Sequence, residues 1–142
     1  MLHAEWMLVD DVPHLIECAG RLPGDRIHRL IDAAYGTSLV GALVEVLAGQ
    51  EVAIGAAGSA AAVLFLVAEP GAVADVRGIE TARGLDGVTE VHVGVGAGGV
   101  VEELTSSWQR PGHVVAVGPD PAAAHARATR AAAAIRISTV PA

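Results

Sequence analysis

The chain has 142 residues, a formal net charge of −7 and a hydrophobic fraction of 52%. Such a chain is long enough to bury a core, and its composition argues against intrinsic disorder. The negative charge argues against nucleic acid or an anionic membrane as a partner, and no apolar run is long enough to span a bilayer. One cysteine and the absence of a signal-peptide pattern predict a cytoplasmic protein.

The first third of the chain predicts a hairpin followed by two helices. Asp25 has the residue type of a helix cap, and Gly36 ends the helix that follows. Thr37 or Ser38 caps a second helix that runs to about Ala48. The hairpin consists of predicted strands at residues 2–9 and 14–19 and a turn at residues 10–13.

The remainder of the chain alternates strands with helices. Asp120 and Pro121 are the residue types that begin a helix, and the alanine-rich segment after them continues it to about Ala134. Without an internal repeat or a long linker, residues 1–142 should form one compact domain of the α+β class, with an antiparallel or mixed sheet and packed helices. Further strands are predicted at residues 60–68, 72–77, 88–95, 113–117 and 135–139, and a short helix at 79–85.

The hairpin carries the strongest candidate site. With the turn centred near residue 11, Glu5 lies opposite Glu17, while His3 and Met7 share the same sheet face. Facing carboxylates destabilise a hairpin by about 0.2–1 kcal/mol unless a divalent cation, a shared proton or a nearby arginine such as Arg21 offsets the repulsion. Alternatively, a register shifted by one or two residues leaves both glutamates in solvent. The same register sets His3 opposite Ala19 and Met7 opposite Leu15.

Three short segments form a motif: His3-Ala4-Glu5, Ile16 to Arg21, and Gly24-Asp25 at the start of a helix. This motif resembles the last motif of the ATP-grasp fold in carboxylate–amine ligases that join amino acids. The resemblance implies that Glu5 and Glu17 bind the magnesium ions of ATP. It also implies that Arg21 holds an acyl phosphate or a tetrahedral intermediate. Ala19 stands where the family has an asparagine ligand, and alanine offers a cation no donor oxygen.

Later landmarks extend the resemblance over nearly the whole chain, namely Ser59–Ala62, Pro70-Gly71, Arg110–Gly112 and Asp120–Ala122. Residues 1–50 then correspond to the end of the ATP-grasp core, and residues 51–142 to the C-terminal lobe. The family's adenine pocket, phosphate-binding lysines and glycine-rich loop come before this motif. All nine basic residues here are arginine. We therefore expect that these residues alone do not use ATP.

Three functions are compatible with these features. The first is an ATP-independent enzyme that acts on a small carboxylate or carbonyl compound by dehydration, proton abstraction or cyclisation, as in natural-product biosynthesis. The second is the C-terminal half of a split ATP-dependent carboxylate–amine ligase completed by a partner chain. The third is a non-catalytic binding or assembly module. In every case an exposed former interface favours a homodimer.

For the preferred first function, no cofactor is expected, although Mg²⁺ could bind at Glu5 and Glu17. The expected catalytic residues are His3, Glu5, Glu17 and Arg21, and the expected substrate-binding residues are Met7, Arg26 and His28.

Other polar residues have structural explanations. We expect Trp6, His14 and Cys18 to pack against helices rather than to bind a metal. Glu90 and His92 should lie on an exposed sheet face. Surface positions are expected for His113, His125, Arg127 and Arg130.

Overall fold

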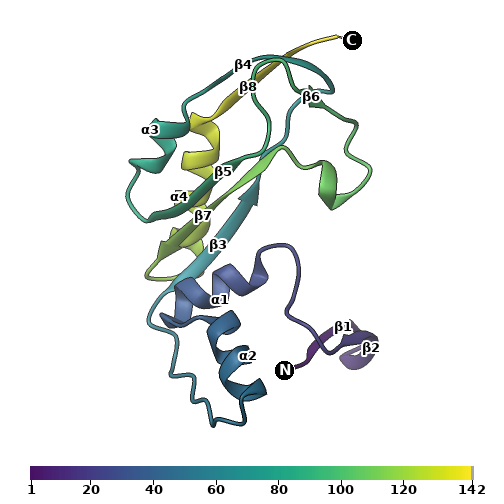
Figure 1. Ribbon diagram of the computed structural model, residues 1–142, viewed down its shortest axis with the longest axis vertical. Helices are drawn as coiled ribbons and strands as arrows, with labels where there is room; N and C mark the ends of the chain where they lie inside the picture. Colours follow the sequence, from purple (N-terminus) through teal and green to yellow (C-terminus); the bar gives the residue numbers. More distant parts are fainter. Residues whose placement is uncertain (142) are drawn as a thin grey trace.

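The computed structural model describes residues 1–141 and has the predicted α+β class, with its strands in small antiparallel sheets. Figure 1 shows the β1–β2 hairpin beside α1 and α2 at one end of the molecule and the remaining sheets at the other. The elements are β1 (His3–Val9), β2 (Val12–Ala19), α1 (Ile27–Tyr35), α2 (Leu39–Leu47), β3 (Ala60–Phe65), β4 (Gly71–Arg77), α3 (Ile79–Arg83), β5 (Val88–Val93), β6 (Val100–Val101), η1 (Ser107–Gln109), β7 (Gly112–Gly118), α4 (Pro121–Ala134) and β8 (Arg136–Val140).

The core lies between α4 and a three-stranded sheet of order β3-β7-β5. Ala124, Ala128 and Ala131 are fully buried on α4, and their spacing places them on one face of the helix. Small side chains on that face allow a close approach to β7, whose Val114 is also fully buried. A second sheet, of order β6-β4-β8, lies beyond the first.

The helix ends were predicted with mixed success. Asp120 caps α4 by accepting a hydrogen bond from Ala123 N at 2.8 Å, and Ser38 caps α2 by accepting one from Gly41 N at 3.1 Å. Gly36 ends α1 in the left-handed conformation, as expected. The prediction that Asp25 caps α1 is wrong, because α1 follows Arg26 and no side chain caps it.

The hairpin has the predicted register where it matters most, because Glu5 pairs with Glu17 and His3 pairs with Ala19. Asp10 and Asp11 form a two-residue turn with φ values of 51° and 61°, which matches the twist of the strands. A bulge after Glu5 then shifts the pairing by one residue. The predicted pairing of Met7 with Leu15 is therefore wrong, since Met7 lies opposite His14.

The hairpin is exposed on both of its faces, so the expectation that Trp6, His14 and Cys18 pack against helices is wrong. All three residues are exposed, and Trp6 retains 59% of its accessible surface. Among the described residues, no single helix is long and apolar enough to cross a membrane, and α1 and α2 meet that test only as a pair bent by 94°.

Arg127 was expected on a solvated stripe of α4, and this is wrong. Its guanidinium donates hydrogen bonds to Val117 O at 2.8 Å and to Asp86 Oδ2 at 2.5 Å, which ties α4 to the loop before β5. Arg130 and His125 are exposed on α4, as expected.

The turn between β4 and α3 requires glycine at position 78. Gly78 has φ 83°, and a side chain there would collide with the carbonyl oxygen of Ala134 at the end of α4.

We expect Gly78→Ala to lower the free energy of unfolding by about 1–3 kcal/mol. The control is Gly96→Ala, where a new methyl group meets nothing within 4 Å, with an expected change within about 0.5 kcal/mol. Urea denaturation measures both, and equal stabilities of the two variants would refute this explanation.

Candidate functional site

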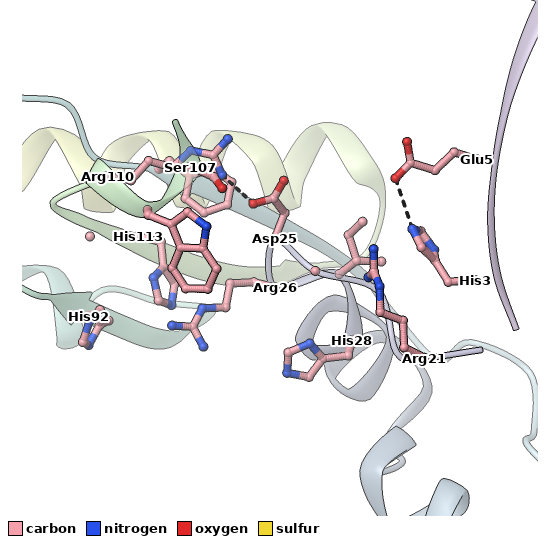
Figure 2. A pocket seen from close by; sticks show the side chains of 15 residues that line it. His3, Glu5, Arg21, Asp25, Arg26, His28, His92, Ser107, Arg110 and His113 are labelled. Atoms are coloured by element: carbon pink, nitrogen blue, oxygen red, sulfur yellow. Dashed lines mark hydrogen bonds and ion pairs between the residues drawn. The ribbon is translucent and has the colours of Figure 1, made fainter. Parts of the chain in front are cut away.

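A cavity of about 620 Å³ lies between the N-terminal segment and the β3-β7-β5 sheet. His3 and Glu5 line it from β1, and the segment from Arg21 to His28 forms its middle. Phe65, His92 and His113 line the side formed by the sheet. Figure 2 shows His3 and Glu5 at one end of the cavity and His92 and His113 at the other, with His28 between them.

At the acidic end of the cavity, Glu5 lines the cavity and Glu17 lies beside it on β2, and the two carboxylates have separate partners. His3 Nε2 lies 3.1 Å from Glu5 Oε1, and Arg21 Nη2 donates to Glu17 Oε1 at 2.8 Å. Of the three ways to offset the repulsion between the glutamates, the structure therefore contains the nearby arginine. One ligand atom each from His3, Glu5 and Glu17 lies within 4.8 Å of the others, which is a spacing that could hold a metal ion.

The structure brings together most of the residues that the sequence singled out. Arg21, Arg26 and His28 line the same cavity as His3 and Glu5. Glu17 is connected to the cavity through its ion pair with Arg21. Met7, the remaining predicted substrate-binding residue, lies farther along β1 with 54% of its surface exposed and is not among the residues that line the cavity.

The turn that precedes α1 has an unusual backbone. Ile27 N donates to Gly24 O at 2.9 Å, and the two residues between them, Asp25 and Arg26, have φ values of 48° and 63°. Left-handed conformations of this kind are costly for residues with a Cβ atom and persist where the surroundings hold them.

Arg110 is the residue that holds this turn. Its Nη1 donates to Asp25 Oδ1 at 2.7 Å, and its guanidinium lies 3.9 Å from the centre of the Phe65 ring. The Asp25 carboxylate therefore binds an arginine 85 residues away instead of capping α1.

A second connection joins α1 to the sheet. Arg29 Nε donates to Glu90 Oε2 at 3.2 Å, and Glu90 Oε1 lies 2.8 Å from His113 Nε2. The ring of His92 lies 5.3 Å from that of His113. The expected exposure holds for His92 but not for Glu90, which is half-buried. The expectation that His113 lies at the surface is wrong, because α1 packs against β3 and β7 and His113 is only 3% exposed.

Burial and neighbouring charges shift the pKa values of both Glu90 and His113. Burial by itself raises the pKa of Glu90, but the hydrogen bond from His113 and the charge of Arg29 outweigh it and hold the pKa below its usual value. Burial lowers the pKa of the His113 imidazole, and the charges of Arg26 and His92 act in the same direction against the hydrogen bond to Glu90. At neutral pH the pair is therefore a carboxylate and a neutral imidazole.

The architecture is similar to that of three solved synthetase and ligase structures. Over 98% of its length the chain superposes on phosphoribosylglycinamide synthetase from Anaerococcus prevotii with a TM-score of 0.80 at 12% identity. It superposes equally completely on L-amino acid ligase from Bacillus licheniformis, with a TM-score of 0.77 at 18% identity. It also superposes over 98% of its length on N5-carboxyaminoimidazole ribonucleotide synthetase from Thermotoga maritima, with a TM-score of 0.67 at 21% identity. At these identities the likeness shows the fold alone.

The chain spans 37%, 36% and 37% of these three proteins, respectively. The family model described as L-amino acid ligase C-terminal domain 2 matches residues 64–140, which is more than half of the chain. The chain therefore belongs to this family. No curated protein matches it.

The lowered pKa of His113 predicts a stability that falls on acidification. The unfolded chain has a histidine of ordinary pKa near 6.5, so it binds a proton at a higher pH than the folded chain does. The contribution of His113 to stability is therefore present above that pH and is lost as the pH falls below it.

We expect His113→Gln to reduce the loss of unfolding free energy between pH 7.5 and 5.5. The exposed-site control His125→Gln should keep the whole loss. Urea denaturation at both pH values tests this, and the same pH dependence in all three proteins would contradict it.

Proposed function

We propose that the chain is the catalytic C-terminal part of an ATP-dependent carboxylate–amine ligase, completed by a nucleotide-binding lobe on a partner chain. The observation that carries the proposal is the group of His3, Glu5 and Glu17 with Arg21, on an uncovered hairpin at one end of a cavity. Membership of the ligase family supports the same function. The split ligase thus ranks above the ATP-independent enzyme that the sequence favoured.

The uncovered hairpin supports a partner lobe. A two-stranded hairpin is marginally stable by itself in water, and this one exposes large apolar side chains on both faces. An apolar surface of this kind marks an interaction site. A nucleotide-binding lobe seated here would lie directly beside Glu5 and Glu17, whereas a second copy of the chain would cover the same surface without supplying a nucleotide site. The exposed apolar residues include Trp6, Leu8, Val9, Val12, Leu15 and Ile16.

The residues at the acidic end suit a divalent cation, which ATP-grasp ligases use with their nucleotide. Glu5 and Glu17 offer carboxylate oxygens, and His3 offers an imidazole nitrogen opposite Ala19, which offers no ligand atom. A mixed oxygen and nitrogen set suits Mn²⁺ better than Mg²⁺. When bound, the cation would neutralise charge on the phosphates of the nucleotide.

The proposed reaction divides into two steps. ATP phosphorylates the substrate carboxylate, which gives an acyl phosphate and ADP, and an amine then displaces phosphate to form the amide. In both steps Arg21, oriented by Glu17 at 2.8 Å, would hold the oxygens of the reacting carboxyl group and stabilise their charge.

Metal binding tests the proposed cation site at Glu5 and Glu17 and requires no catalytic activity. We expect Mn²⁺ to bind the chain, and Glu5→Gln to weaken this binding by at least about 10-fold, because a ligand is lost. Glu45→Gln, on the exposed end of α2, is the matched control and should bind as the wild type does. Electron paramagnetic resonance of free Mn²⁺ gives the dissociation constants. Equal affinities in the three proteins would remove the metal from the proposal.

Reconstitution tests the function. The proposal predicts a separate chain that carries the ATP-grasp nucleotide lobe. The two chains are mixed in the presence of ATP, Mg²⁺ or Mn²⁺, and a panel of amino acids. We expect ADP, phosphate and an amide only when both chains are present. Glu5→Gln and Glu17→Gln should abolish the product, and Glu45→Gln should retain it.

The other two functions predict different results in this experiment. Product formed from the chain alone without nucleotide would support the acid–base enzyme and overturn the ligase. A binding module predicts no product in any mixture and a ligand-induced stabilisation that survives Glu5→Gln and Glu17→Gln. That result would also overturn the ligase.

A further inference from the structure

The cavity gathers arginine and histidine side chains in a protein that is acidic as a whole. Four of the six histidines line it, namely His3, His28, His92 and His113. Arg21, Arg26 and Arg110 line it as well, in a chain of net charge −7. This concentration of cationic and titratable groups in one cavity indicates an anionic ligand.

Two of the three arginines already have a carboxylate partner, and the third does not. Arg21 is bound to Glu17 at 2.8 Å, and Arg110 is bound to Asp25 at 2.7 Å. Within residues 1–141, the Arg26 guanidinium forms neither an ion pair nor a hydrogen bond. A guanidinium that lines a cavity with its donors unused is suited to a carboxylate or a phosphate.

The backbone presents Arg26 to the part of the cavity farthest from Glu5. The left-handed turn at Asp25 and Arg26 is anchored by Arg110, and Figure 2 shows the Arg26 side chain extending toward His113 and His92. The charge of Arg26 is one cause of the lowered pKa of His113, which is consistent with their closeness. His113 is buried and bound to Glu90, whereas His92 is exposed at the cavity and available to a ligand.

We propose that Arg26, assisted by His92, binds a second anionic group of the substrate, a carboxylate or a phosphate, while the reacting carboxylate lies at Arg21. The substrate class is therefore a small acid with two anionic groups, such as a dicarboxylic acid or an acidic amino acid. Only the placement of the reacting carboxylate at Arg21 rests on the proposed function. The cavity volume of about 620 Å³ is ample for a molecule of this size.

Trp108 gives a direct readout of this binding. It lines the cavity and is 95% exposed, and the chain has only one other tryptophan, Trp6 on the hairpin. In a Trp6→Phe background the fluorescence therefore reports on Trp108 alone. Glutarate, butyrate and inorganic phosphate are titrated without nucleotide or partner chain, so that the measurement does not depend on ligase activity.

We expect glutarate to bind at least about 10-fold more tightly than butyrate, since the second carboxylate gains a charge-assisted hydrogen bond to Arg26. Arg26→Gln should remove the difference, and Arg26→Lys should keep part of it. His92→Gln should reduce it. Arg130→Gln, which removes an exposed arginine of α4, is the control and should leave the difference unchanged. Thermal unfolding without ligand checks that each variant is folded.

The phosphate titration identifies the anionic group. Phosphate binding that is lost in Arg26→Gln, with no preference for glutarate over butyrate, would assign the subsite to a phosphate group. Equal binding of glutarate and butyrate together with no Arg26-dependent phosphate binding would overturn the proposal. Because no ATP is present, that result would leave the ligase function standing. Conversely, Arg26-dependent binding without ATP-dependent product in the reconstitution would overturn the ligase function and leave the subsite standing.

Discussion

Two long-range ionic connections hold the N-terminal segment against the β3-β7-β5 sheet, and the candidate site depends on them. Arg110 binds Asp25 and lies over Phe65, which fixes the turn before α1. Arg29 binds Glu90, which is also bound to His113, and this fixes the first turns of α1. No residue of α1 is fully buried, so apolar packing alone holds this helix weakly. The ionic contacts therefore decide where Arg21, Arg26 and His28 lie.

This arrangement produces a cavity with two chemically different ends. At one end the carboxylates of Glu5 and Glu17 lie with His3 and Arg21, a combination suited to a cation and to a reacting carboxyl group. At the other end lie the guanidinium of Arg26, which is positively charged, and the imidazole of His92. A substrate that spans the cavity would be oriented by both ends, which is how a ligase can position one carboxylate of an acid for reaction and leave the other untouched.

Local patterns predicted the parts of this structure that depend on neighbouring residues. The Glu5 and Glu17 pairing follows from strand alternation and a short turn, and the Asp120 cap follows from residue type. The bulge after Glu5 does not follow from alternation, and it changed the partner of Met7. The roles of Asp25, Glu90 and His113 depend on arginines 85 and 61 residues away and on burial beneath α1, which no local pattern contains. The signal that could have found Glu90 and His113 is their polarity within otherwise apolar strands.

Native-state amide hydrogen exchange across residues 24–35 measures most directly whether these connections assemble the site. We expect the amides of α1 in the wild type to be protected, though less than those of β7 and α4. In an Arg110→Gln variant, exchange should become faster in residues 24–35 and stay unchanged in α4. Two results would contradict the assembly of the cavity by these contacts. One is exchange in wild-type α1 at the rate of an unfolded peptide, and the other is an Arg110→Gln variant that exchanges no faster than the wild type in residues 24–35.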